Sequence, residues 1–279
     1  MYYRKAQNDM WQKLFLILTM FTFLSTTSPL LINSQEITKK DINEQTVQAI
    51  LWMHSAAEYK ALCYQAYNLA RLELDNALSK KAKNNKPFAI ITDCDNTILN
   101  DLPAQTYYIG KEISFNLATW TSFVDKAQFK PIPGAVDFFN YAASKGVEIF
   151  YIPNRIEDTE FNGTLKNLKA CGFPMADRKH LLLKTNSSNK QLRYDQVTND
   201  YDVLIYLGDN LGDMPIGTYH KSYLDRNKIV EDKKHLFGTK FIVLPNPVYG
   251  DWESSLIDGY YKLSPSEKDK IKKMILQSE

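Results

Sequence analysis

Five short runs of apolar, β-branched and aromatic residues follow one another along the chain after residue 86. Each run is apolar almost throughout, which is typical of a parallel strand that is covered on both faces of its sheet. We therefore predict β-strands at 87–92, 147–152, 180–184, 203–207 and 240–244, the one at 180–184 being short.

The stretches between these strands have the apolar spacing of helices. We predict helices at 133–146, 157–172 and 187–197. The first two end at Gly146 and Gly172, and glycine is the residue type that most often closes a helix. Regular alternation of strands and helices indicates an α/β fold with a doubly wound, mostly parallel sheet.

Residues 41–82 contain neither Gly nor Pro, and their apolar side chains recur near helical spacing. They predict one long helix or two abutting helices ahead of the first strand. The segment ends in a polar, proline-containing stretch that breaks the pattern.

The first 34 residues differ from the rest of the chain. Basic residues precede an uncharged apolar run at 14–24, and a polar, turn-forming stretch follows it. This order predicts a signal peptide over 1–34, because the run is short for a membrane span, which needs about 20 residues. An uncleaved anchor is the alternative. Export would place the mature chain, 35–279, in the periplasm, at the cell surface or outside the cell, with no membrane attachment after cleavage.

Composition narrows the choice of partners and of redox chemistry. The chain has 34 Lys and Arg against 32 Asp and Glu, a net charge of +2, which argues against a nucleic-acid polymer as partner. Three cysteines, Cys63, Cys94 and Cys171, do not make a disulfide framework, so at most one bridge can form. We interpret Cys94 as a packing residue.

Polar residues directly follow three of the predicted strands. Ligands of open α/β sheets bind beyond the carboxyl ends of the strands, so these residues are candidates for one common site. They are Asp93 and Asp95 after the first strand, Asn154 and Arg155 after the second, and Asp209 and Asp213 after the fourth, with Lys190 at the start of a helix.

Asp93 and Asp95 raise a question of charge. Alternate side chains at a strand end point to the same side, so the two carboxylates converge. They repel each other unless a metal ion or a shared proton compensates. An ordinary acidic turn is the alternative, and the gathering of acids, an amide and cations at one rim argues against it.

These patterns together resemble a known superfamily. DxDxT at 93–97, NR at 154–155, the lysine at 190 and GDNxxD at 208–213 are similar to the haloacid dehalogenase phosphatases. LPNPVYGDWE at 244–253 and the first helical stretch resemble the class C acid phosphatases, an exported 5′-nucleotidase type, and the likeness covers nearly all of the mature chain. It implies the α/β core of that superfamily, with a smaller helical lobe formed by about 36–82, 101–131 and the C-terminal helices. It also implies a small phosphomonoester as substrate, and a homodimer is possible.

The resemblance also implies a role for each catalytic residue. Asp93 would be the nucleophile that forms an aspartyl-phosphate, and Asp95 the general acid and then the general base. Lys190 would neutralise charge on the phosphoryl group, with Lys184 as the alternative, and Asn154 would donate a hydrogen bond to it.

The metal and the substrate follow from the same resemblance. Mg²⁺ would be bound by the carboxylates of Asp93 and Asp209 and by the backbone carbonyl of Asp95, with Asp213 in support. The ring of Tyr249 matches the place where the family stacks a nucleotide base, which favours nucleoside 5′-monophosphates; packing of the helical lobe is the alternative. Arg155 is a candidate substrate-binding residue, and a structural salt bridge is the alternative.

The chain departs from the family in several places. Asn96 and Met214 stand where Glu and Phe are usual, and Pro153 stands where the family offers a Ser or Thr hydroxyl to the phosphate. Proline has neither a hydroxyl nor a backbone N–H, so the site would lack up to two phosphate donors. A surface binding protein on a degenerate phosphatase scaffold is therefore the alternative function.

Overall fold

The computed structural model describes residues 36–80 and 86–277. The predicted signal peptide at 1–34 lies outside the described residues. The description below concerns the unit that begins at Ile37. Among the described residues, none of the helices combines the length and the apolar character needed to span a membrane.

The strands form one four-stranded sheet and one two-stranded sheet. The bounds of the strands are β1 Phe88–Thr92, β2 Leu99–Asn100, β3 Lys130–Pro131, β4 Glu148–Tyr151, β5 Asp202–Gly208 and β6 Phe241–Val243. The larger sheet has the order β4-β1-β5-β6, and every neighbouring pair in it is parallel. The short β2 and β3 pair antiparallel beside it.

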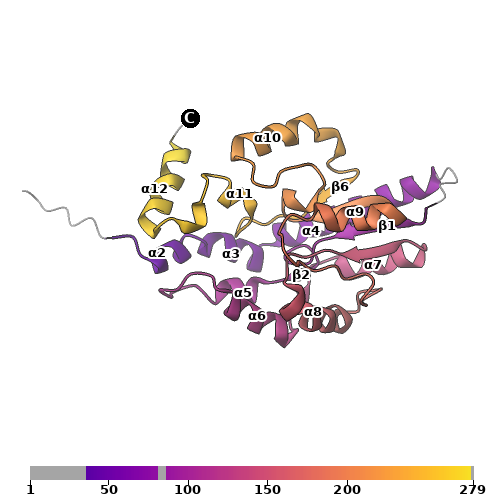
Figure 1. The fold of residues 1–279 in the computed structure, drawn as a ribbon, viewed down its shortest axis with the longest axis horizontal. Coiled ribbons are helices and arrows are strands. Elements are labelled where there is room, and N and C mark those ends of the chain that lie inside the picture. Colours follow the sequence, from indigo (N-terminus) through magenta and orange to yellow (C-terminus); the bar gives the residue numbers. More distant parts are fainter. Residues whose placement is uncertain (1–35, 81–85, 278–279) are drawn as a thin grey trace, which may run out of the picture. The chain divides into compact units, whose positions relative to one another are not determined.

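Helices lie on both sides of the larger sheet, as Figure 1 shows. The helices are α2 Lys39–Glu44, α3 Val47–Ser55, α4 Ala57–Ser79, α5 Leu102–Thr106, α6 Leu117–Lys126, α7 Ala135–Ser144, α8 Glu157–Cys171, α9 Gln191–Asp200, α10 Tyr223–Asp232, α11 Asp251–Ser254 and α12 Pro265–Leu276, with 3₁₀ turns η1 Leu211–Asp213, η2 Lys234–Leu236 and η3 Tyr260–Lys262. Alternate residues of β1 point to opposite faces: Ile90 packs in the cluster that includes α4 and α7, and Ala89 and Ile91 pack with α9. The predicted doubly wound α/β fold is therefore confirmed.

The predicted strand at 180–184 is replaced by two isolated bridges. Leu181 bridges to the end of β4, and Lys184 bridges to Ile156. Between these bridges the facing chain passes through Pro153, which has no N–H to donate and so interrupts the ladder.

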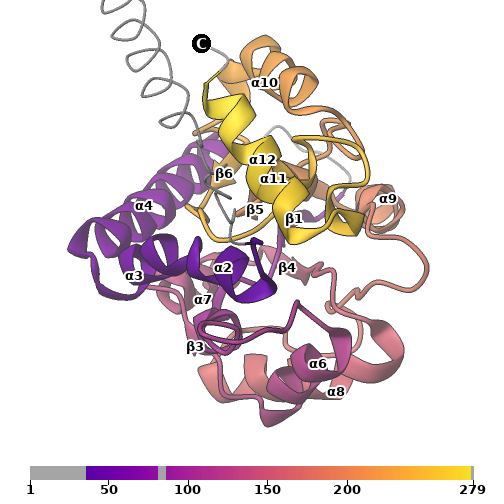
Figure 2. The same cartoon turned by 90° about the vertical axis from the view of Figure 1, so that its left-hand side faces the viewer.

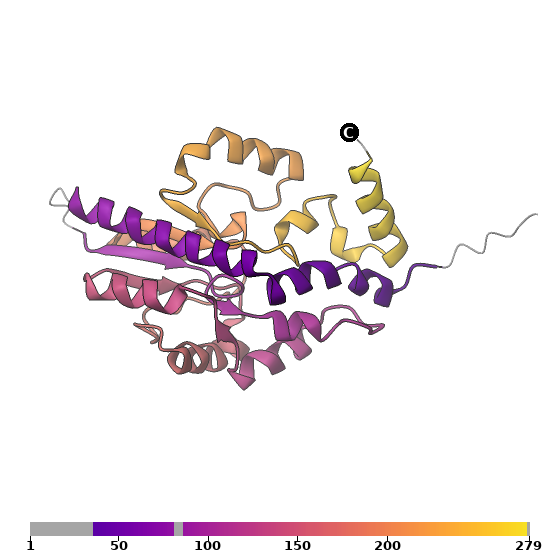
Figure 3. The same ribbon diagram turned by 180° about the vertical axis from the view of Figure 1, so that it is seen from behind.

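The helical segment ahead of β1 consists of three helices rather than one or two. α2 begins with a capping box between Thr38 and Asp41, and Ala56, in an extended conformation, separates α3 from α4. Figure 3 shows the three helices following one another along one side of the structure. α4 packs against α7, β5 and β6, so it covers the sheet, and the predicted lobe segment 36–82 belongs to the lobe only as far as α3.

The lobe joins chain segments from both ends of the described unit. Gln45, which follows α2, donates from Nε2 to Asp269 Oδ1 on α12 at 2.9 Å. Asn43 of α2 donates from Nδ2 to the carbonyls of Tyr108 (3.1 Å) and Lys111 (2.9 Å). Figure 2, which looks onto this end of the molecule, shows α2 next to α12.

All three thiols are free. Cys63 and Cys94 are buried, and Cys171 is half-buried. Cys94 has no exposed surface and lies in the larger hydrophobic cluster, as expected of a packing residue.

Candidate active site

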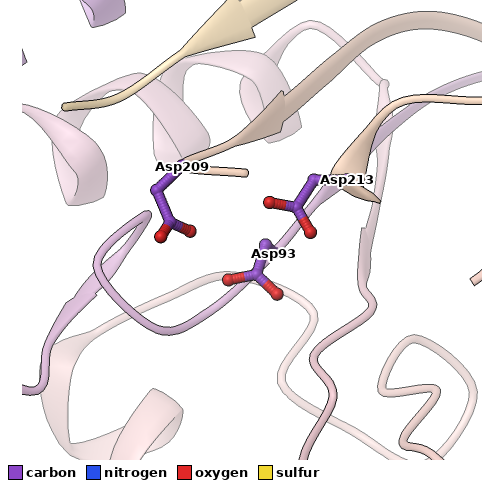
Figure 4. A group of neighbouring side chains, drawn as sticks. All are labelled: Asp93, Asp209 and Asp213. Carbon is purple, nitrogen blue, oxygen red and sulfur yellow. The ribbon is translucent and has the colours of Figure 1, made fainter. Parts of the chain in front are cut away.

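Three aspartates gather at the carboxyl edge of the larger sheet. Asp93 directly follows β1, and its backbone N–H donates to the carbonyl of Leu207 on β5 (2.9 Å). Asp209 directly follows β5, and Asp213 ends η1. One carboxylate oxygen from each lies within 4.8 Å of the other two, and Figure 4 shows the three side chains facing one another. The parallel pairing of β1 with β5 thus brings together residues more than 100 positions apart.

A tight turn after β5 allows Asp213 to reach the cluster. The backbone N–H of Asn210 donates to Asp213 Oδ2 (2.9 Å), which closes a capping box on η1. Gly208 leaves the necessary space, because a Cβ at this position would lie 2.1 Å from the Cβ of Asp213. The glycine of the GDNxxD pattern is therefore required by this close approach.

Lys190 contributes the positive charge next to the cluster. Its Nζ lies 2.5 Å from Asp93 Oδ1 and 2.7 Å from Asp213 Oδ1. The residue is buried and is the N-cap of α9, which sets its direction toward the sheet edge. Lys184, the alternative to Lys190, also lines the cavity described below but has no ion pair among the described residues.

The charges of the cluster do not balance. Burial raises the pKa of Asp93 to about 7, Lys190 opposes this rise, and the charges of Asp213 and Asp95 add to it. Burial likewise raises the pKa of Asp209 well above its usual range, and Asp213 and Asp93 add to it. Three carboxylates here face one ammonium group. An all-oxygen donor set with excess negative charge fits a hard divalent cation such as Mg²⁺.

Two further side chains hold Asp209 in place. Thr97 donates from Oγ1 to Asp209 Oδ1 (2.9 Å), and Asn246 donates from Nδ2 to Asp209 Oδ2 (2.7 Å). Neither residue is among the predicted site residues. Thr97 is the threonine of the DxDxT pattern. Asn246 lies shortly after β6, so it is a polar residue beyond a strand end, like Asp93 and Asp209.

The carboxylate of Asp95 is paired with Arg155. Arg155 donates from Nε to Asp95 Oδ2 (3.1 Å) and from Nη2 to Asp95 Oδ1 (2.7 Å), and its Nη1 donates to Thr164 Oγ1 (3.0 Å). Arg155 is only 1% exposed. The structure thus contains the salt bridge that was the alternative for Arg155, whereas its role in substrate binding stays a prediction. The metal contact assigned to Asp95 involves its backbone carbonyl and also stays a prediction.

Asn154 lies shortly after β4, is exposed, and lines the cavity described below. Its Oδ1 accepts a hydrogen bond from Nη2 of Arg193 on α9 (2.6 Å). Arg193 is not among the predicted site residues, although it lies three residues after Lys190, on the same face of α9.

Tyr249 connects the site with the helical insert. Its hydroxyl donates to Asp101 Oδ2 (2.6 Å), which also accepts from Gln105 Nε2 (3.0 Å). Asp101 has no exposed surface. Burial raises its pKa to about 7, the charge of Asp95 adds to this, and the hydrogen bonds from Tyr249 and Gln105 oppose it.

A cavity of about 1010 Å³ opens over these side chains. The sheet edge and the lobe both line it. The sheet edge contributes Asp93, Asp95, Asn154, Arg155, Lys190, Asp209 and Asp213, and the rest of the wall includes Tyr108, Phe115, Trp120, Tyr249, Tyr260 and Tyr261. Acidic and basic groups at one end and aromatic rings around them suit a small, anionic ligand with an apolar portion.

Known proteins are similar to this chain in fold and in sequence. The chain matches the family described as HAD superfamily, subfamily IIIB (Acid phosphatase), over residues 25–252. Its structure is similar to that of the class C acid phosphatase from Bacillus anthracis, with a TM-score of 0.81 and 41% sequence identity over 85% of this chain and 99% of that one. The tungstate-bound structure of the class C acid phosphatase from Bacillus anthracis gives a TM-score of 0.81 and 40% identity over the same shares. The chain belongs to the acid phosphatases of HAD subfamily IIIB and is a phosphomonoester hydrolase of the class C type.

Proposed function

We propose that this acid phosphatase uses Mg²⁺ to hydrolyse small phosphomonoesters, nucleoside 5′-monophosphates among them, outside the cytoplasm. The observation that carries the proposal is the buried group of Asp93, Asp209 and Asp213 in contact with Lys190 on the wall of a large cavity. A nucleophilic carboxylate, a cation and an oxygen-only metal site in one place are what phosphoryl transfer through an enzyme carboxylate requires.

Asp93 and Asp95 divide the chemistry in this proposal. A carboxylate oxygen of Asp93 attacks phosphorus, the ester P–O bond breaks, and the leaving oxygen takes a proton from Asp95. Water then attacks the phosphorus of the aspartyl-phosphate and gives a proton to Asp95. The bond between phosphorus and the Asp93 oxygen breaks, and inorganic phosphate leaves. Both oxygens of Asp95 accept from Arg155 in the structure, and each keeps a second lone pair through which it can exchange a proton with the ligand.

The charge of the phosphate is met by Lys190, Asn154 and the metal. Lys190 already lies against Asp93, where its ammonium can neutralise a phosphoryl oxygen. Mg²⁺ would be held by the carboxylates of Asp93 and Asp209 and the carbonyl of Asp95, with Asp213 in support. When bound, it supplies the positive charge that lets a phosphate dianion approach a carboxylate.

The cavity supports the proposed substrate class. Tyr249 lines it, and the ring can stack on a base of any identity. The related Bacillus anthracis enzyme binds tungstate, a tetrahedral oxyanion like phosphate. Arg155 as a substrate contact and a homodimer remain predictions within this proposal.

Two observations support the proposal that the protein is exported: the predicted signal peptide at 1–34, and the residue at which the family match begins. The match starts at residue 25, directly after the apolar run at 14–24. A cleaved leader would leave the whole described unit as the mature enzyme in the periplasm, at the cell surface or outside the cell.

The first test is phosphate release by the mature chain from a panel of 5′-mononucleotides and an aryl phosphate, with and without Mg²⁺. We expect release that depends on Mg²⁺, and we expect Asp93→Asn to lower it about 10⁴-fold or more, because the nucleophile is lost. Asp258→Asn, the same change at an exposed position, should leave it unchanged. No release by the parent protein, with mononucleotides still bound, would favour the scaffold alternative that Pro153 raises.

A further inference from the structure

Pro153 leaves a gap in the backbone pairing next to Asn154. Tyr151 donates its N–H to the carbonyl of His180 (2.8 Å), and its own carbonyl accepts from the N–H of Leu182 (2.9 Å). Continued by two residues, this parallel pattern needs an N–H at position 153 that donates to the carbonyl of Leu182. Pro153 has none.

The guanidinium group of Arg193 donates hydrogen bonds to the backbone carbonyls that this gap leaves without partners. Nη1 donates to the carbonyl of Pro153 (2.5 Å) and to the carbonyl of Leu182 (3.4 Å). Nη2 donates to Oδ1 of Asn154 (2.6 Å). One side chain on α9 thus joins both sides of the interrupted ladder and the amide of Asn154.

Arg193 is a buried cation without a carboxylate partner among the described residues. Its side chain is 8% exposed, and its described hydrogen bonds all go to neutral oxygens, whereas Arg155 pairs with a carboxylate. A buried cation without an ion pair is costly, and a cation in the first turn of a helix opposes the helix dipole. The hydrogen bonds to the carbonyls of Pro153 and Leu182 and to Asn154 are what this position offers in return.

Arg193 also decides which way the amide of Asn154 faces. A guanidinium group only donates hydrogen bonds, so Oδ1 of Asn154 must point toward it. Nδ2 is then the end that is left for a ligand, and it makes no hydrogen bond within the part of the chain that the structure describes. Asn154 lines the cavity that also contains Asp93 and Lys190.

We propose that Arg193 is a positioning residue for phosphoryl transfer: it replaces the backbone donor that Pro153 lacks and directs Nδ2 of Asn154 toward a phosphoryl oxygen. The inference rests on the proposed function, in which Asn154 donates to the phosphate. It explains how the chain stays ordered after β4 although proline occupies position 153.

The test is a double-mutant cycle with Arg193→Met and Asn154→Ala, using an aryl phosphate as substrate and inorganic phosphate as inhibitor. Arg193→Met should lower kcat/KM about 10²-fold and raise the Ki of phosphate, as the loss of one directed donor does in such sites. In the Asn154→Ala protein the same change should cost less than about 3-fold, because both changes remove one interaction. An equal loss in both backgrounds would overturn the proposal. Arg71→Met, which removes an exposed guanidinium group stacked on Tyr141, is the control for lost charge.

Two further variants keep the proposal testable if Arg193→Met does not fold. Arg193→Lys keeps the charge but not the planar fork, so it should show reduced kcat/KM; full activity would overturn the positioning role. Pro153→Thr restores the backbone N–H, so Arg193→Lys should cost less in that background than in the parent; an unchanged cost would count against the proposal. A parent protein without phosphatase activity would refute the proposed function itself, whereas an active parent without this coupling refutes only the inference.

Discussion

The rim and the lobe enclose the same cavity but are assembled in different ways. The rim consists of Asp93, Asp95, Asn154, Lys190, Asp209 and Asp213. These residues lie within a few positions of the end of a parallel strand, or, for Lys190, at the start of a helix packed on the sheet. The lobe, α2, α3, α5, α6, α11 and α12, is joined partly by single side-chain contacts such as Gln45–Asp269 and Asn43–Tyr108. Backbone topology therefore places the catalytic side chains, whereas side-chain packing and single hydrogen bonds place the lobe. Changes in the two regions should have different consequences.

The largest contrast is expected from a lysine of the rim. Lys190→Met removes the cation that contacts Asp93 and Asp213 and should lower kcat/KM for every phosphomonoester about 10²–10³-fold. Lys184→Met should have a much smaller effect. Steady-state kinetics on an aryl phosphate and a mononucleotide will decide, and a larger loss in the Lys184 variant would show that the catalytic lysine is misassigned.

The difference in assembly also explains what the sequence could predict. Residues after parallel strands share one edge, so Asp93, Asp209 and Asn154 could be grouped without a structure. Arg193 could not, because its partners include backbone carbonyls, which leave no pattern in the sequence. Helical spacing also shows that a segment is a helix but not which surface it covers, which is why α4 was assigned to the lobe.

A change at Asp101, where the lobe meets the site, should alter the pH dependence of stability. Burial raises the pKa of Asp101 to about 7, so the folded protein holds this proton at a pH where the unfolded chain has released it. The group therefore favours folding at low pH, and this contribution is lost as the pH rises from about 4 through 7. Asp101→Asn cannot titrate, so it should gain about 3 kcal/mol of unfolding free energy relative to the parent between pH 4.5 and pH 8.

Urea unfolding at both pH values, without divalent metal, measures this difference. Asp258→Asn is the matched control, since Asp258 is exposed. A constant difference between parent and Asp101→Asn across the range would mean that Asp101 ionises normally in the folded protein.

The smallest effect should come from the aromatic wall. Tyr249→Ala should raise KM for 5′-mononucleotides about 10-fold while changing kcat/KM for a small alkyl phosphate less than about 3-fold, because only the base would lose its stacking surface. Tyr249→Phe keeps the ring and loses the hydrogen bond to Asp101, so its KM should lie between those of the parent and Tyr249→Ala. Equal losses on both substrates would show that Tyr249 supports the rim rather than the base.

The free thiols bear on how the protein can be produced. All three cysteines are unpaired, and burial raises the pKa of Cys63 to about 11 and that of Cys94 well above its usual range, which keeps both thiols protonated and slow to oxidise. The fold therefore requires no oxidative folding step, although the enzyme is proposed to work in an oxidising compartment. Recombinant chain made in a reducing cytoplasm should reach the same folded state as exported chain.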